Sequence, residues 1–196
     1  MHLAGHSGLA LLAFAPFAYH YCRTDRWRRA GIGTGTVLAL AMLPDVDLYL
    51  PGVAHRGITH TVWAALAVGA LLALLGWRRH AGPDRRGAAR FAFCLGVLSV
   101  LSHLAGDVLT PMGIRPFAPL VGTEYTLALV ASRDPTANLV LLVAGAAAMG
   151  PSLGRAWSRA GRPASVRSLL VLLDARVRGL PASLALADDA VDPAED

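Results

Sequence analysis

Four ionisable side chains of two types stand close together in the first half of a mainly apolar chain. Asp45, Asp47, His55 and His60 lie within sixteen positions, in a segment that begins directly after Pro44. Carboxylate oxygens and neutral imidazole nitrogens are the ligands that hard to borderline divalent metals prefer in proteins. We therefore predict that this segment contributes to a metal site.

A second pair of the same residue types lies in a later apolar stretch. His103 and Asp107 are four residues apart, so on a helix they lie on one face and can point at one ion. His103 alone would more often be an ordinary buried histidine. Together with Asp107 it strengthens the prediction, because ionisable residues inside a membrane-spanning segment usually mark function.

The composition predicts one membrane-embedded domain. The chain has 196 residues, of which 55% are hydrophobic and 16% charged. It is too apolar for an ordinary soluble domain and too short for several domains. Two cysteines, far apart in apolar surroundings, cannot make a tetrathiolate zinc site, and we expect nitrogen and oxygen to bind any metal. No basic stripe with interleaved aromatic residues indicates nucleic-acid binding.

Five apolar runs predict an all-α fold, a polytopic membrane helical bundle. A helix needs about 20 apolar residues to cross a bilayer, and the second and fifth runs are short for this. The five predicted transmembrane helices cover residues 3–22, 30–43, 59–77, 87–109 and 136–149. We expect Thr59 to be the N-cap of the third helix and Gly150 and Pro151 to end the fifth.

The C-terminal part of the chain predicts two further features. In residues 165–180 apolar side chains recur at three- and four-residue steps, which is typical of an amphipathic helix on a membrane surface or a partner. Residues 187–196 are acidic and contain no basic residue, which predicts a disordered tail. We divide the chain into a membrane domain at 1–153, an arginine-rich cytoplasmic segment at 154–186 and this tail.

The distribution of arginine predicts how the helices are oriented. All 18 basic residues are arginine, and with five spans all but Arg56, Arg115 and Arg133 fall on one side of the membrane. The positive-inside rule makes the arginine-rich side cytoplasmic. The N-terminus is then outside and the C-terminus inside, in the cytoplasmic membrane.

This orientation brings the candidate ligands to one side of the membrane. His20 and His80 fall on the cytoplasmic side and are excluded, whereas Asp134 at the start of the fifth helix falls on the outer side. The metal-ligand candidates, all on the outer side, are His6, Asp45, Asp47, His55, His60, His103 and Asp107.

Spacing alone leaves the individual roles open. Seven candidates exceed the three or four protein ligands of one catalytic zinc ion, so either two ions bind or several residues only support the ligands. Aspartates after a proline are also ordinary turn residues. Arg56 either clamps an anionic substrate or forms a salt bridge with Asp45 or Asp47. We assign catalytic roles to Asp45, Arg56 and Asp107.

Three motifs resemble those of a known family. They are Leu43-Pro44-Asp45-Val46-Asp47, His55-Arg56-Gly57-Ile58-Thr59-His60 and Ser102-His103-Leu104-Ala105-Gly106-Asp107. Over about residues 1–150 the chain is similar to bacterial and archaeal inner-membrane proteins described as LexA-regulated, membrane-bound, metal-dependent hydrolases. His6, and Asp134 followed by Asn138, also look like the family pattern. The resemblance implies a polytopic helical membrane protein with a metal site built from these motifs.

The expected function is that of a membrane-bound, metal-dependent hydrolase. We expect one or two divalent ions, with zinc before manganese or magnesium. A membrane lipid or a lipid-linked phosphoester or ester suits a site at the membrane–water boundary. Two alternatives remain, namely a small ion or proton transporter that uses the same residues as a relay, and a non-catalytic scaffold whose loops a structural metal holds together.

Cysteine labelling tests the predicted orientation. In a variant without the two native cysteines, Gly52→Cys reacts with a membrane-impermeant maleimide added to intact cells. Gly82→Cys, between the third and fourth predicted helices, reacts only after lysis, because that loop is cytoplasmic. Labelling of position 82 but not of position 52 in intact cells would show the opposite orientation.

Overall fold

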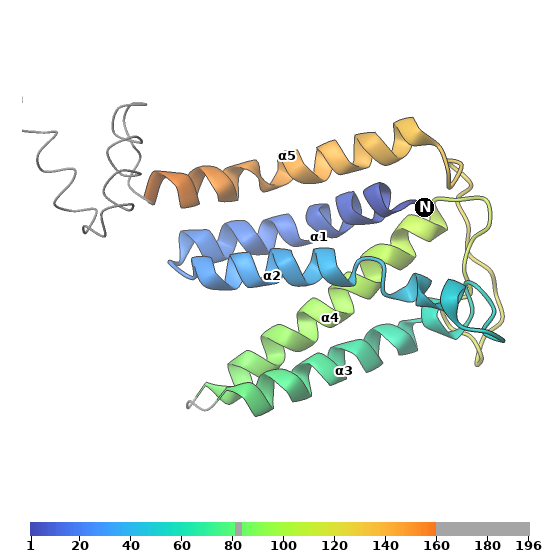
Figure 1. The fold of residues 1–196 in the computed structure, drawn as a ribbon, viewed down its shortest axis with the longest axis horizontal. Helices are drawn as coiled ribbons and strands as arrows, with labels where there is room; N and C mark the ends of the chain where they lie inside the picture. Colours follow the sequence, from blue (N-terminus) through green and yellow to red (C-terminus); the bar gives the residue numbers. More distant parts are fainter. Residues whose placement is uncertain (81–83, 160–196) are drawn as a thin grey trace, which may run out of the picture. The chain divides into compact units, whose positions relative to one another are not determined.

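The computed structural model describes residues 1–80 and 84–159. These residues form α-helices and short 3-10 helices joined by irregular connections, so the predicted all-α fold is confirmed (Figure 1). The predicted helix at 165–180 and the acidic tail at 187–196 lie outside the described residues. The elements are α1 (Leu3–Arg23), α2 (Trp27–Leu40), η1 (Pro44–Tyr49), η2 (Ile58–His60), α3 (Val62–Arg79), α4 (Arg85–Val108) and α5 (Pro135–Arg159).

Most of the long helices have the length and composition of membrane spans. Among the described residues, four segments qualify by these two measures: Trp27–Tyr49, Val62–Arg79, Arg85–Val108 and Pro135–Ala156. Helix α1 is not among them, although its 21 residues give a length of about 30 Å. Polar residues such as His6 and His20 lower its hydropathy. The fold therefore agrees with a bundle of about five membrane helices.

Two predicted helix ends are wrong. Helix α3 has Thr61 as its N-cap, because the Thr61 hydroxyl accepts a hydrogen bond from the backbone N–H of Ala64 at 3.2 Å. Thr59 lies before it in η2. Helix α5 continues through Pro151 to Arg159, because neighbouring groups in a membrane bundle can compensate for the hydrogen bond that a proline removes.

Helix α4 is the central element of the bundle. It packs against α1, α2 and α3. One apolar cluster joins it to α1 and α2 around Phe14 and Leu95, and a second joins it to α3 around Val100. A Cβ atom on Gly96 would lie 2.8 Å from the Cα of Gly69, so these glycines let α3 and α4 approach closely, as small residues do in membrane proteins.

The polar candidates gather where several elements end. In Figure 1 the start of α1, the end of α4 and the two 3-10 helices lie at one end of the unit formed by Met1–Leu153. The backbone N–H of His2 donates to Asn138 Oδ1 at 3.1 Å and so ties α1 to α5. Val62 N donates to the Pro116 carbonyl at 2.9 Å. These contacts hold the connections around the site, while the orientation of the bundle in the membrane stays a prediction.

Candidate metal centre

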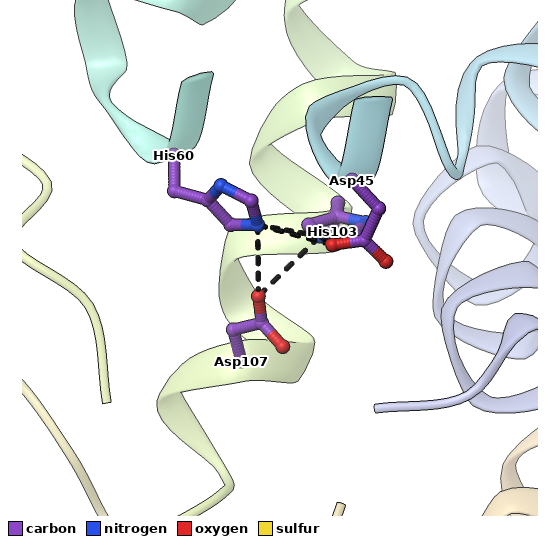
Figure 2. Close-up of side chains that lie close together, drawn as sticks. All are labelled: Asp45, His60, His103 and Asp107. Atoms are coloured by element: carbon purple, nitrogen blue, oxygen red, sulfur yellow. Dashed lines mark hydrogen bonds and ion pairs between the residues drawn. The ribbon is translucent and has the colours of Figure 1, made fainter. Parts of the chain in front are cut away.

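Four buried side chains direct one donor atom each into the same small volume (Figure 2). Asp45 comes from η1, His60 from η2, and His103 and Asp107 from successive turns of α4. His60 Nε2 lies 3.2 Å from His103 Nε2 and 3.3 Å from Asp107 Oδ2. Asp45 Oδ1 lies 3.3 Å from His60 Nε2 and 3.4 Å from His103 Nε2. A fifth distance, from His103 Nε2 to Asp107 Oδ2, is 3.3 Å.

These separations fit a tetrahedral metal ion. In a tetrahedral zinc site with metal–ligand distances of about 2.0–2.1 Å, neighbouring donor atoms lie about 3.3–3.4 Å apart. Asp107 Oδ2 is buried and has no hydrogen-bond partner, which a native structure rarely tolerates without a ligand or water. The Nε2 atoms of His60 and His103 also face each other, at 3.2 Å. The four residues can therefore hold one divalent ion.

The 3-10 geometry of η1 sends its two aspartates to different places. Pro44 begins this element, and in a 3-10 helix three residues complete each turn. Asp45 points at the four-atom cluster, whereas Asp47 lies on the far side of the His60 ring, with its Oδ2 atom 3.2 Å from His60 Nδ1. Asp47 therefore contacts the potential ligand His60 and does not point at the four-atom cluster itself.

Each histidine of the cluster is oriented through its second ring nitrogen. His103 Nδ1 lies 2.7 Å from the carbonyl oxygen of Ala41, which can only accept a hydrogen bond. His60 Nδ1 lies 3.0 Å from the Thr59 hydroxyl oxygen, which itself donates to Asp47, and 3.2 Å from Asp47 Oδ2. Both Nδ1 atoms therefore carry the proton, and both Nε2 atoms are left free for a metal, as is usual for metal-binding histidines.

Asp47 connects the cluster to two neighbouring residues. Its Oδ1 atom lies 2.9 Å from His55 Nδ1. Its Oδ2 atom accepts hydrogen bonds from the Thr59 hydroxyl at 2.7 Å and from the backbone N–H of Arg56 at 3.1 Å. Asp47, His55 and His60 are close enough to form a second group of potential ligands. Because these donors already occupy the Asp47 oxygens, we favour a single ion.

Arg56 forms an ion pair, but with neither aspartate of η1. Its Nη2 donates to Asp107 Oδ1 at 2.8 Å, and its Nη1 donates to Thr110 Oγ1 at 3.0 Å and to the Gly113 carbonyl at 2.9 Å. The backbone of Arg56 is left-handed, with φ of 59°, which costs about 1–2 kcal/mol for such a residue. These three hydrogen bonds, together with the one that the Arg56 backbone N–H donates to Asp47, offset this cost and hold Asp107 Oδ2 toward the cluster.

His6 lies beside the cluster rather than in it. Its ring stacks on that of His103, with centroids 3.7 Å apart and planes 7° from parallel. His6 Nε2 is 3.7 Å from Asp107 Oδ1, and both ring nitrogens are buried without a hydrogen-bond partner. A Cβ atom on Gly106 would lie 2.9 Å from His6 Nδ1, so this glycine makes room for the histidine. His6 therefore covers one face of the potential ligand His103.

The carboxylates also change the acidity of His60. Burial by itself lowers the pKa of His60, but the neighbouring carboxylates of Asp107 and Asp45 outweigh burial and raise this pKa above its usual value. Without a metal, the imidazole therefore keeps its proton to a higher pH than usual. A metal ion must displace this proton, so metal affinity falls as the pH is lowered.

A cavity of about 300 Å³ reaches the cluster. Two of the four potential ligands line it, Asp45 and Asp107, together with His55, Arg56 and Arg133 among other residues. A second cavity, of about 490 Å³, shares His55, Arg56 and Met112 with the first. The site is therefore accessible to a small molecule or to a group carried by a larger one.

Sequence reasoning missed three supporting groups. The Thr59 hydroxyl binds Asp47, and its place directly before a candidate histidine was the available signal. The Thr110 hydroxyl binds Arg56, and it lies three residues after Asp107 in the same stretch of sequence. The Ala41 carbonyl orients His103. No side-chain pattern can reveal this last contact, because every residue has a carbonyl.

A family comparison agrees with this site. The model of the family described as YdjM inner membrane protein matches residues 1–178, which include every residue of the cluster and its supports. The chain belongs to the YdjM inner membrane protein family. This confirms the family resemblance deduced from the motifs and supports a location in the inner membrane. No curated protein and no solved structure matches the chain.

Metal analysis of purified variants tests the cluster. We expect wild-type protein, purified without chelator and offered zinc, to bind about one ion per chain, and His60→Ala and His103→Ala to lose it. His20→Ala, which changes an exposed histidine far from the cluster, retains the ion. Asp47→Asn keeps the stoichiometry but lowers the affinity about 10- to 100-fold, because Asp47 orients His60 without coordinating the metal.

Elemental analysis gives the stoichiometry, and competition with a chelating dye gives the affinity. Equal zinc content in the wild type and both alanine variants would contradict the assignment of the cluster.

Proposed function

We propose that this protein is a metal-dependent hydrolase that cleaves a lipid-linked phosphoester or ester at the outer face of the cytoplasmic membrane. The observation that carries the proposal is the set of four donor atoms, 3.2 to 3.4 Å apart in the pairs given above, with a cavity open to two of the four residues. The outer face follows from the arginine distribution.

The ion would be held by Asp45, His60, His103 and Asp107. A divalent ion supplies Lewis acidity to a phosphoryl or carbonyl oxygen and lowers the pKa of water toward neutrality. The protein contributes a fixed arrangement of donors, since Arg56, Asp47 and the Ala41 carbonyl each hold a ligand in place. Such preorganisation avoids rearrangement during the reaction.

Two side chains at the cavity can move protons. Asp45 uses its Oδ1 atom in the cluster, while its other oxygen points away from the cluster in Figure 2 and can accept a proton from water. His55 is one-third exposed, and its Nδ1 is engaged by Asp47. Its Nε2 is therefore the atom that can protonate a leaving group. In this proposal His55 acts on the substrate rather than on the metal.

The alternative of a purely structural metal is less well supported. Four protein ligands are typical of structural zinc, but such sites are usually rich in cysteine and closed. This cluster contains no thiolate, and Asp45 and Asp107 line a cavity. A catalytic ion with this ligand set needs a fifth coordination position or a carboxylate that moves aside, and five-coordination occurs in catalytic zinc sites.

The transporter alternative requires a polar path to the other side. After His6 in the chain, the buried side chains of α1 are apolar as far as Ala18, and His20 is exposed. On α4 the hydroxyls of Ser99 and Ser102 donate to carbonyls of their own helix. Within the described residues, a continuous chain of ionisable groups does not extend from the cluster toward the opposite end.

Hydrolysis assays test the proposal. In detergent micelles, zinc-loaded protein releases product from a lipid phosphomonoester, a phosphodiester or a fluorogenic fatty-acid ester. Chelation abolishes the activity and metal restores it. We expect His60→Ala and His103→Ala to lower kcat at least about 100-fold, because removing the metal removes its Lewis acidity, and His20→Ala to match the wild type. A protein that binds one ion per chain but cleaves none of these substrates would favour the structural role instead.

A further inference from the structure

Arg133 is the one arginine of the predicted outer side whose side chain has no partner among the described residues. Arg56 pairs with Asp107 at 2.8 Å, and Arg115 pairs with Glu124 at 3.3 Å. Arg133 is exposed and lines the cavity of about 300 Å³. Its guanidinium therefore offers five N–H donors and a permanent charge to whatever enters that cavity.

The backbone around Arg133 is held by a network of hydrogen bonds. Asp134 Oδ1 accepts from the backbone N–H groups of Thr136 at 2.8 Å and Ala137 at 3.1 Å, which caps helix α5. Asn138 Nδ2 donates to the carbonyls on both sides of Arg133, at 3.2 Å to Ser132 and 2.6 Å to Asp134. These bonds fix the position from which the Arg133 side chain extends.

This network explains two residues that the metal cluster does not use. Asp134 and Asn138 were singled out in the sequence, yet neither lies in the cluster of potential ligands. Asn138 is 3% exposed, and its Oδ1 atom accepts a hydrogen bond from the backbone N–H of His2. The segment that carries Arg133 is thus tied to the start of α1 and so to the wall of the cavity.

The charges around the cavity favour an anion. A divalent ion would balance the negative charges of the Asp45 and Asp107 carboxylates. The guanidinium of Arg56 already binds Asp107. Arg133 then forms no ion pair within the part of the chain that the structure describes. Planar guanidinium groups bind phosphate oxygens in pairs, through charge-assisted hydrogen bonds.

We propose that Arg133 binds the phosphate group of the substrate at the mouth of the metal cavity and that Asp134 and Asn138 position it there. This inference rests on the proposed function and narrows its substrate class to phosphoesters. Arg133 is a specificity residue in this account, because it selects substrates with a negative charge.

Binding of inorganic phosphate tests the inference. The full-length protein in a nonionic maltoside detergent, free of phospholipid, is titrated with phosphate by calorimetry in zinc-loaded and metal-free forms. We expect Arg133→Gln to weaken phosphate binding about tenfold or more, as the loss of a charge-assisted hydrogen bond predicts, and Arg133→Lys to lose less. Arg115→Gln, which changes an arginine paired with Glu124, binds phosphate as the wild type does.

Four results would overturn the inference. The first is that Arg133→Gln binds phosphate as well as the wild type does in both the zinc-loaded and the metal-free form. The second is that the wild type binds no phosphate. The third is that Arg115→Gln loses as much phosphate affinity as Arg133→Gln. A fourth measurement separates a membrane anchor from a substrate site. If Arg133→Gln changes only the binding of micelles that contain phosphatidylglycerol, Arg133 contacts the lipid surface and the inference fails. Zinc content, measured on the same samples, tests the proposed function independently.

Discussion

The structure depends on the close approach of two carboxylates and two imidazoles in a buried site. Placing a charged group in a protein interior costs several kcal/mol unless it is compensated. Here the carboxylates of Asp45 and Asp107 converge on the nitrogens of His60 and His103 from three separate elements. A bound cation would compensate these charges and join η1, η2 and α4. The surrounding hydrogen bonds hold these four side chains in this arrangement.

The supports form a connected set rather than independent contacts. Asp47 binds His60 and also His55, so the same carboxylate orients a potential ligand and a potential proton donor. Arg56 joins the 45–60 connection to Asp107, 51 residues further along the chain. Helix α1 adds His6, which stacks on His103. A change in any one of these residues is therefore expected to affect the geometry of the others.

Sequence could predict the parts of the site that regular structure determines. His103 and Asp107 are four residues apart on a helix, and helical geometry alone places them on one face. The roles of Asp45, Asp47 and His55 could not be separated, because they depend on a 3-10 turn and on the left-handed backbone of Arg56. Contacts made through backbone carbonyls leave no signal in the sequence. The fold class followed from the apolar runs, whereas helix ends depended on local contacts.

X-ray absorption at the zinc K-edge reports directly on the atoms that surround a bound ion. We expect zinc bound to the purified protein to have nitrogen or oxygen neighbours at about 2.0–2.1 Å, with multiple scattering that corresponds to two imidazole rings. A sulfur neighbour, a spectrum without imidazole scattering, or a six-oxygen shell would contradict the assignment of Asp45, His60, His103 and Asp107 as the metal ligands.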